Sequence, residues 1–278
     1  MGNKKIALIT GYDTNIIARE TAQLLINDNY QVLAVCVNKN NFSSKQNDIT
    51  FMQADLFDQT SLMALLSELK KYNFDAIVNC HAVLALTEKN ELRHEFFDFD
   101  YISFDSTIRS NVTSIAALCI GLKDNIVSNG CIVNVTSSAA EEGAFATISY
   151  NASKAAIKNL SMSLANNFGL YNGVRVNCVA PGWIPQSKDV VAGNIVDLAN
   201  KMTPLSPYGN PTEVAFAILN LINNPYANNV SYRVDGGITS SYLMYMLESI
   251  DLNGGNTSKE MQILINTIKT AKEKLKKM

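Results

Sequence analysis

Three residues near the middle of the chain carry side chains that could move a proton. Ser137 is followed after twelve residues by Tyr150, and Tyr150 after three residues by Lys154. On a helix, the tyrosine and the lysine would share one face. A phenol with a pKa of about 10 is a weak acid near neutrality, and an ammonium one turn away favours the phenolate and lowers that pKa. We therefore predict a proton-transfer pair, with Ser137 holding a substrate oxygen beside the phenol.

The same spacing of tyrosine and lysine also occurs on ordinary exposed helices, so the surrounding elements decide its meaning. Short β-branched runs alternate with longer amphipathic segments, which is typical of βαβ units. The expected strands are 6–10, 31–37, 49–54, 76–79, 131–136, 174–180 and 231–235, and the expected helices are 16–28, 61–72, 103–127, 149–170 and one that opens at Pro211. We predict an α/β chain with a doubly wound Rossmann fold, in which helices cover both faces of a seven-stranded, mostly parallel sheet.

The first expected strand runs into a loop, residues 10–17, where a Rossmann fold seats a pyrophosphate on the N-terminus of a helix. Of the glycines that such a loop usually has, only Gly11 is present. Asn15 takes the second position, and asparagine tolerates a positive φ, which would preserve the tight turn. Ile17 takes the third, where a branched side chain would crowd the helix against the sheet or narrow the approach of the phosphate. The candidate pyrophosphate contacts are Gly11, Thr14, Asn15 and Ile16.

Eight landmarks follow one another in a recognisable order. They are TG at 10–11, Asp55 after the third strand, NCHA at 79–82, Asn111, NVTS at 134–137, YNASK at 150–154, RVNCVAPG at 175–182 and VDGG at 234–237. In order and spacing they resemble the short-chain dehydrogenase/reductase family, most closely its 3-oxoacyl carrier-protein reductase branch, over residues 4–237. The resemblance implies a nicotinamide cofactor, hydride transfer between that cofactor and a ketone or secondary alcohol, and a homo-oligomer, a dimer or a tetramer.

The resemblance also implies roles for the candidate catalytic residues. Tyr150 would be the general acid/base, and Lys154 would modify its pKa and hold the cofactor's ribose. Ser137 would orient the substrate, and Asn111 would stand in a proton relay. Asn111 has an alternative explanation as a buried helical amide that bonds backbone groups.

On the cofactor side, the resemblance implies a second set of contacts. Asp55 and Leu56 would contact the adenine, Asn79 would lie beside the adenosine half, and Pro181, Gly182 and Ile184 would border the nicotinamide. Asp55 is explained equally well as a helix N-cap. His81 stands where the family prefers alanine, either as a wall at the ribose or as a packing histidine.

The choice between the two nicotinamide cofactors rests on the end of the second strand. An acidic residue there would accept the ribose hydroxyls of NAD(H), but the strand ends in VCVNKNN without one. Asn38 and Lys39 could meet a 2′-phosphate instead. The sequence therefore favours NADP(H) over NAD(H).

Two segments are expected to border the substrate, a small carbonyl or alcohol compound that is either free or carrier-bound. Residues 183–208 fall where family members carry a mobile lid, and Trp183, Met202 and Tyr208 there would line a pocket or simply pack. Residues 83–104 would form the opposite rim. Neither segment names the substrate.

Composition argues against several other classes of function. A formal net charge of -2 supplies no broad positive field for nucleic acid. The five cysteines are widely spaced in apolar runs, which indicates buried free thiols, and the two histidines stand apart, so we expect no metal site. No apolar run approaches the ~18 residues of a membrane helix, and the first residues lack a signal-peptide core, so we expect a cytoplasmic protein with no membrane partner.

We expect one domain over residues 1–237 and a C-terminal extension over 238–278. Residues 258–278 place apolar side chains along one helical face and add six Lys against two Glu, which indicates an amphipathic basic helix. Such a helix would dock on its own domain, on a second subunit, or on a membrane surface or partner. Two other functions also fit the sequence: a redox-inactive binding or scaffolding subunit, which the missing glycines favour, and a non-redox lyase or epimerase.

Overall fold

The computed structural model describes residues 4–38, 45–46, 48–83, 100–142, 148–185, 203–205 and 208–239. Several sequence-based predictions lie outside these residues. They are Lys39, Met202, most of the lid, positions 84–99 of the opposite rim, and the extension beyond Thr239, with its amphipathic helix.

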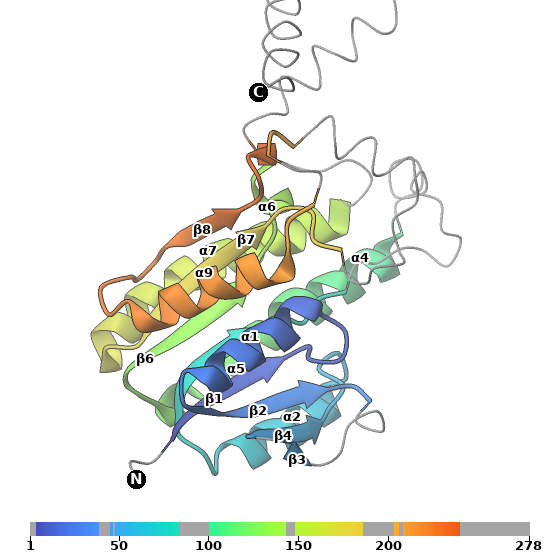
Figure 1. Cartoon of the computed structure of the whole chain (residues 1–278). Coiled ribbons are helices and arrows are strands. Elements are labelled where there is room, and N and C mark those ends of the chain that lie inside the picture. Colours follow the sequence, from blue (N-terminus) through green and yellow to red (C-terminus); the bar gives the residue numbers. More distant parts are fainter. Residues whose placement is uncertain are drawn as a thin grey trace, which may run out of the picture.

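One sheet runs through the whole described chain (Figure 1). Its strands are β1 (Lys5–Thr10), β2 (Tyr30–Cys36), β3 (Lys45–Gln46), β4 (Ile49–Gln53), β5 (Phe74–Asn79), β6 (Ile126–Val135), β7 (Arg175–Pro181) and β8 (Ser231–Val234). Their order is β3-β4-β2-β1-β5-β6-β7-β8, and all neighbours are parallel except β3 and β4. The predicted seven-stranded parallel sheet is confirmed; the two-residue antiparallel strand β3 was not predicted.

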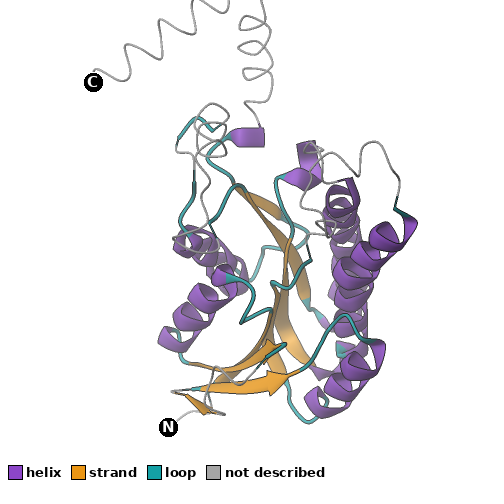
Figure 2. Cartoon of the chain, turned by 90° about the vertical axis from the view of Figure 1, so that its right-hand side faces the viewer, coloured by secondary structure: helices purple, strands orange, loops and turns teal. Residues whose placement is uncertain are grey.

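Helices cover both faces of this sheet, as Figure 2 shows. The main helices are α1 (Ile16–Asn27), α2 (Gln59–Leu69), α4 (Tyr101–Ile108), α5 (Ser114–Gly121), α7 (Ile148–Asn172) and α9 (Pro211–Asn223), and a short helix, α6 (Ala139–Glu142), precedes α7. Because successive strand side chains point to opposite faces, each strand feeds two cores. In β1, Ala7 and Ile9 pack in the core under α1 and α9, and Leu8 packs in the core under α2, α5 and α7. This is the doubly wound arrangement that the sequence predicted.

The helix predicted over 103–127 is divided in the structure. A π-helical segment (Arg109–Thr113) joins α4 to α5, a 3-10 turn follows at Lys123–Asn125, and β6 begins at Ile126. The side chain of Asn125 donates hydrogen bonds to the backbone oxygens of Lys70, at 3.0 Å, and Tyr72, at 2.9 Å. These bonds tie the chain reversal to the end of α2, which explains why the helix stops earlier than its apolar pattern indicates.

The strand register aligns the carboxyl ends of the central strands. Thr10 of β1 is opposite Asn79 of β5, Asn79 is opposite Asn134 of β6, and Asn134 is opposite Cys178 of β7. The loops that leave these strands therefore meet at one edge, beside the point where the strand order reverses between β1 and β5. In open α/β sheets this is where ligands bind.

Candidate functional site at the carboxyl edge of the sheet

A cavity of ≈ 390 Å³ opens at this edge. Residues from the loops after β1, β5, β6 and β7 and from α7 line it, among them Asn15, Ala82, Ser137, Tyr150, Lys154 and Ile184. The structure thus brings together the predicted catalytic serine, tyrosine and lysine from two segments of the chain. Asn111, the fourth predicted catalytic residue, is not among the residues that line this cavity.

The three catalytic candidates form a connected group. Tyr150 and Ser137 line the same cavity, close enough for the serine hydroxyl to influence the phenol, and that hydroxyl accepts a hydrogen bond from the backbone N–H of Ala139, at 3.2 Å. One turn along α7, the side chain of Lys154 is only 2% exposed, and its Nζ donates to the backbone oxygen of Val135, at 2.8 Å. That Nζ lies 5.5 Å from the centre of the Tyr150 ring. The phenol, a hydroxyl and a buried amine therefore share one cavity wall.

Burial governs the acidity of both groups on α7. It raises the pKa of Tyr150, and the hydrogen bond from Ser137 opposes that rise. It lowers the pKa of Lys154 to about 8, because the charged ammonium is poorly solvated there. The sequence predicted a lowered pKa for Tyr150, and this geometry gives the opposite direction. The ammonium is turned toward the Val135 carbonyl, so loss of water outweighs its effect on the phenol.

Asn111 lies in the π-helical segment and is fully buried. Its Oδ1 accepts from the backbone N–H of Val83, at 2.7 Å, and its Nδ2 donates to the backbone oxygen of Val83 and to the Ser153 hydroxyl, both at 2.9 Å. The side chain thus clamps the loop after β5 against α7. These bonds match the alternative explanation of Asn111 as a buried amide that bonds backbone groups. None of them reaches Lys154, and the role of Asn111 in a proton relay stays a prediction.

Asn79, predicted beside the adenosine half, has a different position. Its Nδ2 donates to Oδ1 of Asn134, at 2.8 Å, and Nδ2 of Asn134 donates to the Ser161 hydroxyl, at 2.8 Å. Asn79 is fully buried and is not among the residues that line the cavities at this edge. Its side chain ties β5 to β6 and α7, so its predicted cofactor contact is not supported by the geometry.

The loop after β1 keeps a tight turn with a single glycine. Gly11 has φ +74, and a Cβ there would lie 2.8 Å from the backbone of His81. Asn15 has φ −131, so the positive φ that the sequence allowed for it is wrong. It is instead the N-cap of α1: its Oδ1 accepts from the backbone N–H of Ile17, at 3.0 Å, and its Nδ2 donates to the Cys80 oxygen, at 2.9 Å. The side-chain amide therefore fixes the loop where a second glycine usually stands.

Ile17, in the position of the third glycine, is a core residue. It is 3% exposed and packs in the core beneath α1 and α9, and it also borders the cavity of ≈ 390 Å³. Ile16 begins α1, and the Thr14 hydroxyl donates to the Gly11 oxygen, at 3.4 Å. The branched side chain is thus accommodated by packing, and the cavity beside it remains open.

A second cavity, of ≈ 280 Å³, lies on the other side of this loop. Gly11, Thr14 and Leu56, all predicted cofactor contacts, line it together with Asp13, Phe57 and His81. Asp55 does not: it is exposed, and its Oδ1 accepts from the backbone N–H of Phe57, at 2.9 Å. Asp55 is also not a helix N-cap, because Asp58 caps α2. The backbone N–H of Asn38 donates to Oδ2 of Asp13, at 2.9 Å, so Asn38 lies at the rim of this second cavity.

Comparisons with known proteins agree with this arrangement. The family model described as enoyl-(acyl carrier protein) reductase matches residues 13–239. Carbonyl reductase family member 4 of Xenopus laevis is 29% identical over 234 residues, which cover 80% of this chain and 93% of that protein. The chain belongs to the short-chain dehydrogenase/reductase family.

A second curated relative and a solved structure give further comparisons for this short-chain dehydrogenase/reductase. Carbonyl reductase family member 4 of Danio rerio is 36% identical over 134 residues, which cover 48% of this chain and about half, 55%, of that protein. The structure of 4-hydroxyisoleucine dehydrogenase complexed with NADH has the same fold, with a TM-score of 0.75 and 22% identity over 85% of this chain and 99% of that one. By their names, the proteins that these comparisons match include carbonyl reductases and a dehydrogenase complexed with NADH.

The described residues fit such a cofactor. Ala82 lines both cavities, so the two cavities lie side by side along the ends of the strands. Gly11 lines the second cavity and has no side chain, which lets the loop approach the backbone of His81 closely. Asp13 lines the second cavity, and its buried carboxylate oxygen Oδ1 has no hydrogen-bond partner among the described residues. The Asp13 carboxylate could therefore accept hydrogen bonds from the hydroxyl groups of such a cofactor.

His81 departs from the family pattern and has a structural role. Its Nδ1 is 2.6 Å from the Thr10 hydroxyl and its Nε2 is 2.8 Å from the Ser114 hydroxyl. Burial lowers its pKa to about 3, with the charge of Lys154 acting in the same direction, so the ring is neutral. These bonds fit the packing explanation, and the ring also contributes to the wall of the second cavity.

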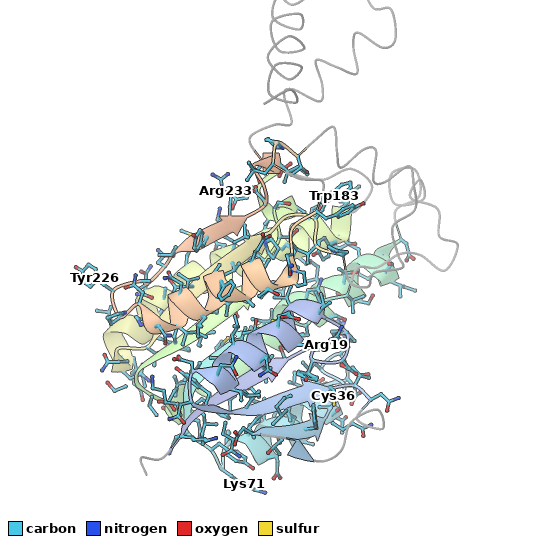
Figure 3. All side chains as sticks on the ribbon, viewed as in Figure 1. Arg19, Cys36, Lys71, Trp183, Tyr226 and Arg233 are labelled. Atoms are coloured by element: carbon cyan, nitrogen blue, oxygen red, sulfur yellow. The ribbon has the colours of Figure 1, made fainter. Side chains whose placement is uncertain are left out.

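Beyond β7, the predicted nicotinamide contacts border the first cavity. Pro181, Gly182 and Ile184 line it, and Gly182 is held close to β8, where a Cβ would lie 2.7 Å from the Cα of Asp235. Trp183 and Tyr208 also line it, with ring centres 6.3 Å apart. Figure 3 shows Trp183 near the carboxyl end of the sheet, above α9. The pocket interpretation of these two aromatic residues fits the structure.

Proposed function

We propose that the protein transfers hydride between a nicotinamide cofactor and a ketone or secondary alcohol, with Tyr150 as the general acid/base. The observation that carries this proposal is that Tyr150 and Ser137 line one open cavity, with a buried amine, that of Lys154, one helical turn from the phenol. A phenol and a hydroxyl in this arrangement can both bond one carbonyl oxygen. The cofactor, when bound, supplies or accepts the hydride at the carbonyl carbon.

In the direction of reduction, the chain's own residues manage the proton. Ser137 donates a hydrogen bond to the substrate oxygen, and the Tyr150 O–H delivers the proton that the new alcohol needs. A phenolate remains on Tyr150 after this transfer. The Nζ of Lys154, 5.5 Å from the centre of the phenol ring, stabilises that phenolate when the lysine is protonated. Asn111 acts as a positioning residue, because its amide holds the backbone of Val83 beside the cavity. In the direction of oxidation, the phenolate takes the proton from the alcohol.

The test is the Tyr150→Phe variant, assayed with NADH and NADPH against a short 3-oxoacyl thioester and a free 3-oxo ester. These probes also decide between a carrier-type and a free substrate. Loss of a positioned acid costs about 10²–10⁴-fold in turnover, and the fold should be unchanged. Tyr171→Phe, on the exposed part of the same helix, is the matched control and should retain full activity. Undiminished turnover by Tyr150→Phe would refute the mechanism. If the protein bound neither NADH nor NADPH, the redox-inactive scaffold would be the better explanation.

Assembly and location are proposed on separate grounds. We place the protein in a homo-oligomer, a dimer or tetramer, because Tyr101 and Ile102 on α4 are 69% and 79% exposed, as is common at subunit contacts. Light scattering that finds a monomer at about 50 μM, well above typical complex Kd values, would contradict this. We place it in the cytoplasm because all five cysteines are buried free thiols, as in reducing compartments. No helix among the described residues is both long and apolar enough to cross a membrane.

A further inference from the structure

We propose that Asp13 makes this enzyme select NAD(H) over NADP(H), by accepting hydrogen bonds from the adenosine ribose and excluding a 2′-phosphate. This inference rests on the proposed function, since it names the cofactor of that same site. It also replaces the preference for NADP(H) that the sequence indicated from Asn38 and Lys39.

The position of the Asp13 carboxylate is the first step. Asp13 belongs to the loop between β1 and α1, yet its Oδ2 accepts from the backbone N–H of Asn38, at 2.9 Å. Asn38 follows β2, which ends at Cys36. The loop thus delivers a carboxylate to the end of the second strand, where an acid binds the ribose of NAD(H) and where the second strand itself has none. The acid reaches that place from a different segment of the chain.

The second step is the unused half of the carboxylate. Oδ1 of Asp13 is buried and has no hydrogen-bond partner among the described residues. Asp13 lines the cavity of ≈ 280 Å³ together with Gly11, Cys36 and Leu56. A buried carboxylate oxygen without a donor is unfavourable, and it is satisfied when a ligand brings O–H groups into the cavity. Vicinal ribose hydroxyls are donors of this kind, and a carboxylate can accept from both.

The third step is the charge around Asp13. The described ion pairs do not include this carboxylate. Arg19, on α1, directs its Nη1 to the backbone oxygens of Tyr12 and Asp13, each at 3.3 Å, and thereby holds the loop. Figure 3 shows Arg19 and Cys36 on the same side of the molecule, where α1 begins and β2 ends. Arg19 thus bonds the backbone of the loop, and no described ion pair joins it to the Asp13 carboxylate.

These features discriminate between the two cofactors. The ribose of NAD(H) offers hydroxyl donors to Oδ1. The 2′-phosphate of NADP(H) would place an acceptor with about two negative charges beside a carboxylate that has no proton to donate. The same side chain therefore attracts one cofactor and repels the other.

The test measures the Kd of NADH and NADPH by fluorescence titration of the full-length protein. Because a hydrogen bond to a charged group is worth about tenfold or more in affinity, the wild type should bind NADH at least about tenfold more tightly than NADPH. In Asp13→Asn, the amide oxygen can still accept from the backbone N–H of Asn38. The negative charge is lost, and an N–H₂ donor takes the place of Oδ1. NADH affinity should fall and NADPH affinity should rise, so the ratio of the two Kd values should change by about a hundredfold.

Asp124→Asn is the matched control, because Asp124 is an exposed aspartate in the 3-10 turn before β6 and does not line either cavity. It should leave the ratio unchanged. Titration with ADP-ribose, which lacks nicotinamide, should show the same loss in Asp13→Asn, and circular dichroism checks that the variants fold. Tighter binding of NADPH than of NADH by the wild type, or an unchanged ratio of Kd values in Asp13→Asn, would overturn the role of Asp13 and leave the proposed function standing. Failure of every variant to bind either nucleotide would overturn the proposed function as well.

Discussion

Replacing Lys154 with methionine should make the protein more stable at neutral pH while abolishing its activity. The folded state holds this side chain at 2% exposure, and burial lowers its pKa from 10.5 to about 8. That change corresponds to about 3 kcal/mol against the charged amine in the folded state. Methionine keeps the aliphatic packing but loses the hydrogen bond from Nζ to the Val135 oxygen, worth about 1 kcal/mol. The net expectation for Lys154→Met is a gain of about 2 kcal/mol in unfolding free energy.

The pH dependence of this gain gives a second, independent check. Below pH 8 both folded and unfolded wild type carry the proton, so the whole cost of the buried ammonium is present. Between pH 8 and 10.5 the folded state loses the proton while the unfolded state keeps it, so the wild type becomes more stable as the pH rises. The advantage of Lys154→Met should therefore be full at pH 7 and close to zero near pH 9.5, within the error of about 1 kcal/mol.

Urea unfolding at pH 7 and pH 9.5 measures both effects. Circular dichroism and the fluorescence of Trp183, the one tryptophan, should report the same transition if two states suffice. Lys158→Met, one turn along the same helix, is the control: its side chain is 33% exposed and pairs with Glu141, so its change should stay within about 1 kcal/mol. A Lys154→Met variant that is less stable than the wild type at pH 7, or whose advantage persists unchanged at pH 9.5, would refute the reasoning.

Three further predictions concern the frame of the site. Gly11→Ala should lower the free energy of unfolding in urea by about 2 kcal/mol or more, because a Cβ there meets the backbone of His81. Gly173 has the same φ of +74, but the nearest atom to a Cβ there is 3.5 Å away, so Gly173→Ala should cost about 1 kcal/mol. Equal losses in the two variants would contradict the close approach to His81. Asn111→Ala should cost about 2–4 kcal/mol, because it leaves the N–H and C=O of Val83 unpaired, and a loss under about 1 kcal/mol would contradict the clamp. The NMR signals of the His81 ring should not titrate between about pH 5 and 8, because its pKa is about 3.

The fold could be predicted because its signals are local. A sheet covered on both faces needs strands that are apolar throughout, and every residue of β7 is buried as that rule requires. The failures came where distant contacts decide. The early end of the helix before β6 depends on the hydrogen bonds from Asn125 to the end of α2, and no sequence window contains that information.

The candidate site was predictable to the extent that it lies on one motif. Tyr150 and Lys154 share a helical face by spacing alone, and Ser137 reaches them because it follows the neighbouring strand. The carboxylate of Asp13 carried no such signal, because its partner, Asn38, lies on another loop. Asn79 shows the opposite case: its motif was recognised, but the direction of its side chain is set by its hydrogen bond to Asn134, and its cofactor contact stays a prediction.

The energetics of Lys154 bear on the choice between an enzyme and a scaffold. A fold that only binds partners gains nothing from a buried amine that costs about 3 kcal/mol and recovers about 1 kcal/mol from one backbone hydrogen bond. A proton-transfer site does need that amine beside a phenol, and it also needs the cavity to stay open. Ile17 is the feature that most favoured the scaffold, but it is absorbed into the core and leaves the cavity beside Tyr150 in place. The same site therefore carries an uncompensated energetic cost and a clear chemical use, and this combination favours catalysis.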